Sequence, residues 1–183
     1  CYRVSEVMTR SGFTRLGIEN VGTLMTRGVL LDVAALKGVT VLPESYEITV
    51  EDLQQALQRQ QTTLEPGDAV LIHTGWGGFY ESDPERFSSN GPGIGIAAAD
   101  WLVAHDPMLL GADNVSVEVS PNPDAQLNAP VHQIMLVVHG IHLVERMKLD
   151  ELASSQVYEF AFVVQPLKLK GATGSSVAPV AIY

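Results

Sequence analysis

The sequence of 183 residues is poor in cysteine, in basic residues and in long apolar runs, and each shortage excludes a class of protein. Its single cysteine, Cys1, cannot form an internal disulfide, which excludes a small secreted fold held by disulfides. Eleven Lys and Arg residues against 21 Asp and Glu residues give a net charge of −10. Nucleic acids and anionic membranes need a basic surface, so neither is an expected partner. No apolar run approaches the roughly 18–20 residues of a membrane-spanning helix.

The chain begins with Cys1 and not with methionine, and no signal segment is visible in it. A mature bacterial lipoprotein also begins with cysteine, but we expect instead that an upstream segment is missing from this sequence and that the protein is cytoplasmic. The hydrophobic fraction of 46% is enough for a packed core and excludes a disordered chain. Since no repeat, low-complexity tract or linker divides the sequence, we predict a single domain over residues 1–183.

Apolar strands alternating with helices predict an α/β fold with a mixed β-sheet and flanking helices. The helix after Thr49 has the clearest beginning, because the threonine hydroxyl can cap free N–H groups and two acids follow it. Residues 120–130, rich in proline and asparagine, are expected to form a loop. We expect strands at 24–33, 69–74, 114–119, 141–145, 158–169 and 177–182, and helices after Thr49 and at 96–105, 131–139 and 148–154.

Three features of the sequence are only weak indications of a binding or catalytic site. The glycine-rich residues 91–95 precede a helix, yet they do not follow a strand directly and lack the dinucleotide spacing, so a structural turn is the better interpretation. Cys1 has no base beside it, and the sequence has no Gly-x-Ser-x-Gly elbow for a nucleophile. Trp76, Phe79 and Tyr80 follow the strand at 69–74, where they either stack on a flat substrate or anchor the loop.

His132 and Glu145 are the candidate metal ligands. His132 opens a predicted helix directly after Pro130-Val131, and Glu145 stands in an otherwise apolar predicted strand. A carboxylate is costly to bury unless it is paired, hydrogen-bonded or bound to a metal. Imidazole and carboxylate together suit zinc or manganese, although two ligands alone do not hold a metal tightly. His73, at the end of a strand before a glycine turn, either lines a cleft or caps the sheet.

Several segments, in order from about residue 16 to the end, resemble the cyclase family of metal-dependent hydrolases. This family includes bacterial kynurenine formamidase and isatin hydrolase. The segments that carry the resemblance are 26–33 (TRGVLLDV), 67–76 (GDAVLIHTGW), 92–94 before a helix, 111–113 (GAD), the block from His132 to Glu145, and the tail with PLK and GATG at 166–168 and 171–174.

The resemblance implies a swivelling β/β/α arrangement and a divalent metal ion, manganese or zinc. The implied reaction is hydrolysis of a C–N bond in a small aryl-formamide or cyclic amide, formylkynurenine-like or isatin-like, by a metal-activated water. His132 and Glu145 match the family's downstream histidine and acid, which help to hold a second metal or the bound water. Family members are homodimers or larger homo-oligomers, so the same is expected here.

One departure from the family affects function directly. Most of the family's metal ligands come from a His-x-Gly-Thr-His-x-Asp stretch, followed by a histidine that acts as general base, and none of these occurs in the sequence. We expect that motif and the general-base histidine upstream of Cys1. The alternative is a fold relative without catalysis that binds a ligand or has a structural role. The sequence upstream of Cys1 would separate the two hypotheses.

Overall fold

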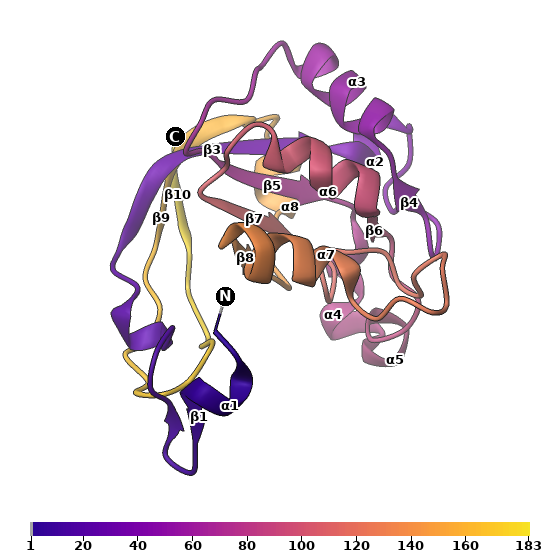
Figure 1. The fold of residues 1–183 in the computed structure, drawn as a ribbon. Helices are drawn as coiled ribbons and strands as arrows, with labels where there is room; N and C mark the ends of the chain where they lie inside the picture. The colour runs from indigo at the N-terminus through magenta and orange to yellow at the C-terminus, as the bar shows by residue number, and fades with distance from the viewer. Residues whose placement is uncertain (1) are drawn as a thin grey trace. The chain divides into compact units, whose positions relative to one another are not determined.

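The structure is a computed structural model, and it describes residues 2–183. Six strands are hydrogen-bonded in the order β10-β9-β3-β5-β7-β8 (Figure 1). The chain divides into two compact units, and the division runs through strands β3 and β9. One unit holds Gly28–Glu159, and the other holds the described residues up to Arg27 together with Phe160–Tyr183.

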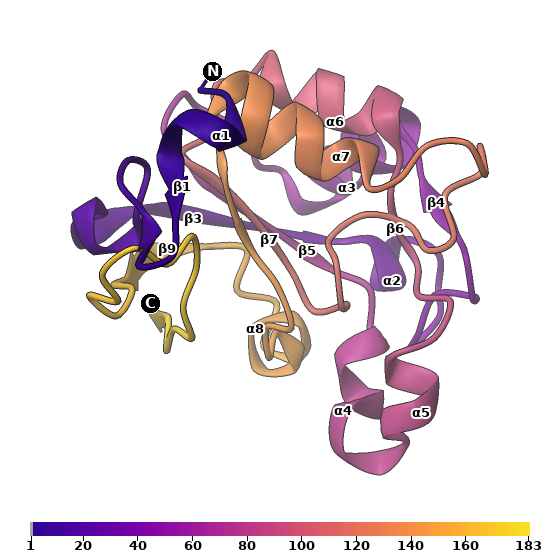
Figure 2. The ribbon, with the colours of Figure 1, turned by 60° about the horizontal axis from the view of Figure 1, so that its bottom comes forward.

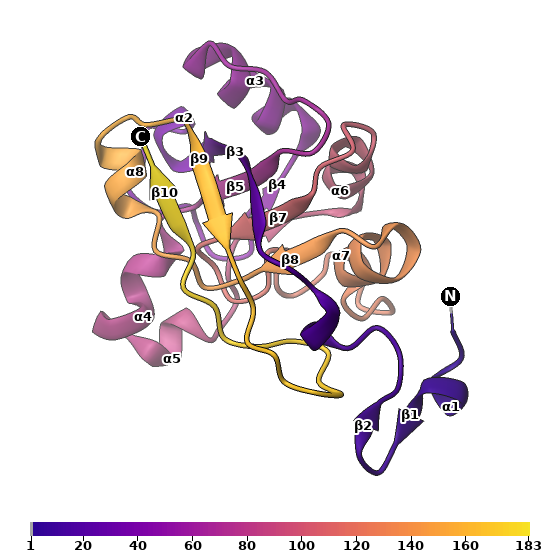
Figure 3. The ribbon, with the colours of Figure 1, turned by 90° about the vertical axis from the view of Figure 1, so that its left-hand side faces the viewer.

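The unit made of the two chain ends consists of short elements. Its β10 pairs antiparallel with β9, and its β1 pairs antiparallel with β2 (Figure 3). Gly12, the first residue of β2, has a φ of +99°, a backbone conformation that glycine adopts without steric cost. The elements are α1 (Val4–Val7), β1 (Met8–Thr9), β2 (Gly12–Phe13), η1 (Ile18–Asn20), β9 (Glu159–Val164) and β10 (Val180–Ile182).

The unit Gly28–Glu159 is built on parallel strands. β3 pairs with β5, β5 with β7, and β7 with β8, all parallel. In β3, β5 and β7, nearly continuous runs of Val, Leu, Ile and Ala are buried, as is typical of parallel strands that are covered on both faces. Their bounds are β3 (Leu24–Asp32), β5 (Ala69–His73), β7 (Leu109–Ala112) and β8 (His142–Val144), with a separate parallel pair of β4 (Glu47–Ile48) and β6 (Gly93–Ile94).

Helices cover both faces of these parallel strands. Figure 2 shows α3, α6 and the helix that starts with α7 on one face and α8 on the other. The main core lies on the first face, where Leu53 of α3, Leu102 of α6 and Met135 join alternate residues of the strands. The helices are α2 (Val33–Leu36), α3 (Val50–Gln60), η2 (Trp76–Gly78), α4 (Phe79–Ser82), α5 (Pro84–Phe87), α6 (Ile96–Val103), α7 (Pro130–His132), the π-helix η3 (Gln133–His139) and α8 (Asp150–Ser154).

The predicted α/β fold with a mixed sheet and flanking helices is confirmed, but the predicted strand at 114–119 is wrong. That segment consists of bends with one isolated bridge at Glu118, and the neighbouring strand β7 ends at Ala112. The side chain of Asn114 accepts a hydrogen bond from Val117 N at 2.7 Å, and Val117 has a φ of +63°. Such local side-chain bonds compete with a strand, and polar alternation in the sequence does not reveal them.

Other predicted elements are present with different bounds. The strands predicted at 158–169 and 177–182 shrink to β9 and β10, because Pro166 and Pro179 cannot donate to a ladder. The helix predicted at 131–139 is one short α-helical turn followed by a π-helix. The strand predicted at 141–145 ends at Val144, so Glu145 lies directly after β8 and not within it.

No helix in the part of the chain that the structure describes is long and apolar enough to cross a bilayer.

The cap of α3 gives a test of the fold. Thr49 accepts a hydrogen bond from Asp52 N, while Asp52 accepts one from Thr49 N, so two free donors of the first turn are satisfied. Thr49→Ala should lower the free energy of unfolding by about 1 kcal/mol, measured by guanidinium denaturation. Thr40→Ala, at an exposed position outside a cap, is the control and should change it by less than about 0.5 kcal/mol. Equal effects of the two substitutions would contradict the capping assignment.

Candidate metal centre

His132 stands in the first turn of α7, and the local sequence explains why the helix begins there. Pro130 is the first helical residue, a position where the missing N–H of proline costs nothing and its fixed φ suits the helix. Ala129 before it has a φ of +48° and turns the chain into the helix. Val131 is fully buried in the core and anchors this turn, so the imidazole of His132 projects from a fixed backbone.

Glu118 lies beneath this turn and contacts it three times. Its carboxylate accepts hydrogen bonds from Val131 N at 3.2 Å and from His132 N at 3.4 Å, and its Oε1 is 2.5 Å from Nδ1 of His132. N–H groups of a first helical turn have no partner within the helix, and a negative charge is favourable there. Glu118 is 5% exposed, and these bonds compensate for its burial.

Glu145 meets the other side of the same ring. Its Oε1 is 3.1 Å from Nε2 of His132, so the imidazole lies between two carboxylates. The Glu145 side chain is 35% exposed and that of His132 is 30% exposed. Solutes can therefore reach the side of the His132 ring that faces Glu145. The structure thus brings together the two predicted site residues. Their role as metal ligands stays a prediction.

The two carboxylates change the protonation of the histidine. The hydrogen bond to Glu118, and then the one to Glu145, raise the pKa of His132 to about 9, although partial burial opposes this. Carboxylates only accept hydrogen bonds, so in the metal-free protein both ring nitrogens of His132 carry a proton. A metal ion that binds Nε2 therefore replaces the proton that faces Glu145.

These residues fit part of a metal site. Nε2 of His132 and Oε1 of Glu145 are nitrogen and oxygen donors, and their separation of 3.1 Å suits two ligands of one ion with bonds of about 2.0–2.2 Å. A carboxylate on the far nitrogen, here Glu118 on Nδ1, is the usual support of a metal-binding histidine. No group of three or more His, Cys, Asp or Glu side chains within residues 2–183 is arranged to hold an ion, so the pair is a partial donor set.

A second polar cluster lies at the carboxyl ends of the parallel strands, and the sequence pointed to only one of its members. Asp32 ends β3 and His73 ends β5, and the two are partners in the parallel register. Nδ1 of His73 is 2.8 Å from Asp32, while Nε2 is 3.8 Å from Asp113 and 4.0 Å from Asp150. Asp113 accepts hydrogen bonds from Thr74 and from Gly75 N. His73 therefore ties the strand ends together.

Burial and charge act in opposite directions on this cluster. Burial by itself lowers the pKa of His73, but the hydrogen bond to Asp32 and the charges of Asp113 and Asp150 outweigh it and raise the pKa. Burial also works against the charge of Asp32, yet its bonds to His73 and to Ala35 N keep its pKa below the usual range. Asp113 is enclosed, and burial raises its pKa.

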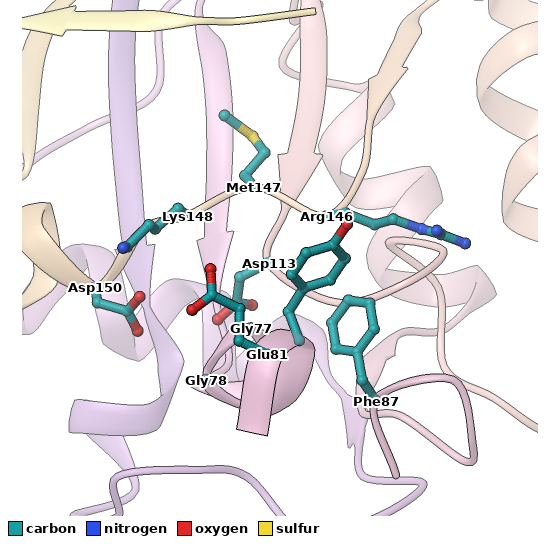
Figure 4. A pocket seen from close by; sticks show the side chains of 10 residues that line it. Gly77, Gly78, Glu81, Phe87, Asp113, Arg146, Met147, Lys148 and Asp150 are labelled. Atoms are coloured by element: carbon teal, nitrogen blue, oxygen red, sulfur yellow. The ribbon is translucent and has the colours of Figure 1, made fainter. Parts of the chain in front are cut away.

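A small cavity of about 170 Å³ opens beside the His73 cluster, and Asp113 and Asp150 of that cluster line it (Figure 4). In Figure 4 the carboxylates of Glu81 and Asp113 lie near each other, that of Asp150 lies to their left, and the Arg146 side chain extends to the right. Trp76 does not line the cavity: it is fully buried, and its Nε1 donates to Phe87 O at 3.0 Å. Of the two interpretations of the aromatic loop, anchoring therefore applies to Trp76.

Comparison with known proteins establishes the family. The cyclase family model, whose description is "Putative cyclase", matches residues 9–119, which is more than half of the chain. The solved structure of "a novel cyclase" is similar, with 37% identity and a TM-score of 0.86, over 98% of this chain and 61% of that one. The chain belongs to the cyclase family. No curated protein matches it.

More distant structures share the fold. Isatin hydrolase A from Ralstonia solanacearum has a TM-score of 0.72 at 22% identity, over 90% of this chain and 63% of that one. A structure described as a "Potential Metal-Dependent Hydrolase With Cyclase Activity" has a TM-score of 0.61 at 20% identity, over 95% of this chain and 72% of that one. The cyclase-like fold is thus one that hydrolases use. The chain spans less than two thirds of the length of the novel cyclase and of isatin hydrolase A.

The His73 cluster predicts a pH-dependent contribution to stability. A histidine whose pKa is higher in the folded than in the unfolded protein stabilises the fold fully below its unfolded pKa of about 6.5 and loses this effect as pH rises through the folded pKa. The stability advantage of the wild type over His73→Asn should therefore be largest below about pH 6.5 and fall as the pH rises above that value, measured by guanidinium denaturation.

Thr40→Ala supplies the control, because it changes no ionisable group at an exposed position and its difference from the wild type should not change with pH. An advantage of the wild type over His73→Asn that is constant or grows with pH would show that His73 is not held protonated by its acidic neighbours.

Proposed function

We propose that this protein is a metal-dependent hydrolase that cleaves the C–N bond of a small aryl-formamide or cyclic amide. The observation that carries the proposal is the pair of His132 and Glu145, two donors 3.1 Å apart at the surface, with Glu118 behind the ring. Membership of the cyclase family and the fold shared with isatin hydrolase A support the reaction class. Formylkynurenine-like and isatin-like compounds are the proposed substrates.

In the proposed reaction, the described residues of this chain would act mainly by holding donor groups around the metal ion. A bound zinc or manganese ion would supply Lewis acidity and lower the pKa of a bound water toward neutrality. His132 and Glu145 would contribute one nitrogen and one oxygen donor to the ion. In hydrolysis the water oxygen bonds to the carbonyl carbon, the C–N bond breaks, and a proton passes to the leaving nitrogen.

The rest of the donor set is also part of the proposal. A His-x-Gly-Thr-His-x-Asp stretch is absent from the 183 residues, and so is the general-base histidine that follows it in the family. We propose that the full-length protein supplies both from outside this sequence and that it works in the cytoplasm. The competing function, ligand binding without catalysis, predicts a full-length protein without bound metal.

Substitution of the two donors tests the proposal. In the full-length protein, His132→Ala and Glu145→Ala should each reduce metal affinity or turnover by about tenfold or more, because each removes a ligand of an ion with few others. Metal content is measured by elemental analysis, and turnover with a panel of formamides and lactams in added manganese or zinc.

His139→Ala, on the exposed face of η3, is the matched control and should change neither quantity. Unchanged metal content and rate in both donor variants would refute their assignment. A wild type that holds no metal and hydrolyses nothing would favour the competing function.

We also propose that the protein is a homodimer or a larger homo-oligomer. Leu136 and Val138 on η3 are 45% and 66% exposed, and exposed large apolar side chains on one helix support an interface there. Two-fold pairing is the commonest assembly of soluble enzymes. Light scattering of the full-length protein at micromolar concentration should give at least a dimer mass, and a clean monomer mass would contradict the proposal.

A further inference from the structure

We infer that Glu118 is a positioning residue, which fixes the His132 ring so that Nε2 faces Glu145 and the site where a metal would bind. The inference deepens the function proposed above and rests on it. Glu118 is not one of the residues predicted from the sequence, because the sequence pattern predicts only a polar strand at 114–119. Its assignment comes from the contacts that its carboxylate makes.

The two oxygens of Glu118 are engaged separately. Oε2 accepts from Val131 N at 3.2 Å, whereas Oε1 accepts from His132 N at 3.4 Å and lies 2.5 Å from Nδ1 of the same residue. A carboxylate only accepts, so Nδ1 must be the donor in the last contact. One side chain thus fixes both the backbone of the helical turn and the rotation of the ring that the turn carries.

This arrangement decides which nitrogen is available. With the Nδ1 proton held by Glu118, only Nε2 can give a lone pair to an ion. Nε2 is also the atom 3.1 Å from Glu145. If the ring rotated away from Glu118, Glu118 would be left as a buried carboxylate with fewer partners, which is costly. The contact therefore selects one ring orientation out of several.

The backbone that carries Glu118 is itself held in place. Val117 before it has a φ of +63°, which is rare for a β-branched residue and persists only when the surroundings impose it. The side chain of Asn114 supplies part of this constraint, since it accepts from Val117 N and donates to Glu118 O at 3.4 Å. The hydroxyl of Ser116 also donates to Glu118 O, at 3.0 Å.

Strand β6 fixes the same segment from the other side. Ile94 N donates to Val117 O at 3.1 Å, and Ile94 O accepts from Val119 N at 3.1 Å. A Cβ on Gly93 would lie 2.3 Å from the carbonyl carbon of Glu118, so only glycine permits this approach. The glycine-rich residues 91–95 therefore have a use without any phosphate: they let β6 pack directly against the backbone of the positioning residue.

A capping role alone would not require the contact to the ring. Asp52 provides the comparison, because it is a buried carboxylate that accepts from Thr49 N at the start of α3 and contacts no histidine. Because both acids are buried at a helix start and only Glu118 contacts a histidine, Glu118→Gln and Asp52→Asn form a matched pair of substitutions. Glu118→Gln keeps the size of the side chain but replaces one acceptor oxygen by an NH2 donor, which would face a donor at either Val131 N or the His132 ring and leave one of these without its acceptor.

The experiment has two readouts in the full-length protein. The first is the orientation of the His132 ring in metal-free protein, from crystal structures of the wild type, Glu118→Gln and Asp52→Asn. The second is the affinity for zinc and for manganese alone, by titration calorimetry. Glu118→Gln should release the ring from its place beside Glu145 and weaken metal affinity about tenfold to a hundredfold. Asp52→Asn should change neither.

The outcomes separate this inference from the proposed function. A Glu118→Gln variant that keeps both the ring orientation and an affinity within twofold of the wild type would overturn the inference. If the wild type binds neither metal, the proposed function fails, while the ring orientation still decides the role of Glu118. Should Glu118→Gln not fold, Glu118→Asp is used, which keeps the charge but is too short for all three contacts. The ring should then leave its place beside Glu145 and metal affinity should fall. Wild-type values of both would overturn the inference.

Discussion

The short contact between the Glu118 carboxylate and Nδ1 of His132 is the interaction on which the candidate centre depends. It links a buried acid to a half-buried ring, and a partly exposed acid, Glu145, completes the line at the surface. The three groups come from a bent loop, a helical turn and the residue directly after strand β8, and they are 14 and 13 residues apart in the sequence. A buried carboxylate without partners costs free energy, and a ring without partners can rotate. The contact between Glu118 and His132 makes a single arrangement of the two favourable.

The fold supplies this arrangement through the ends of its parallel strands. The chain leaves β7 into the bends that hold Glu118, and it leaves β8 directly into Glu145. The carboxyl ends of β3 and β5 carry Asp32 and His73, which bind each other and not the candidate centre. Polar groups therefore gather where parallel strands end, the usual place for sites in open α/β sheets. One cluster has the geometry of partial metal ligation, and the other ties the strand ends together.

The sequence revealed those parts of the molecule that depend on local patterns. Buried strands such as 24–33 stand out as runs of Val, Leu and Ile, and the helix after Thr49 is marked by its cap. Glu145 stands out because an acid within an apolar predicted strand requires a partner, and the structure places it beside His132, while the metal ligation of the two stays a prediction. The metal that would explain both, its identity and the assembly of the protein stay predictions.

What the sequence could not reveal depends on backbone conformations and contacts that form only in the folded chain. Glu118 looked like one polar residue of a strand, because nothing nearby shows that Val117 adopts a left-handed conformation or that Asn114 closes the bend. Gly93 looked like part of a turn, since its close approach to the Glu118 backbone exists only in the folded chain. Such features could be foreseen only by knowing which segments the sheet brings together.

Anomalous diffraction from crystals of the full-length protein, recorded at the absorption edge of zinc or manganese, would locate the metal ion itself. We expect an anomalous peak bonded to Nε2 of His132 and to a carboxylate oxygen of Glu145, with Glu118 still on Nδ1. A metal bound elsewhere, with His132 and Glu145 left in contact only with each other, would contradict this expectation.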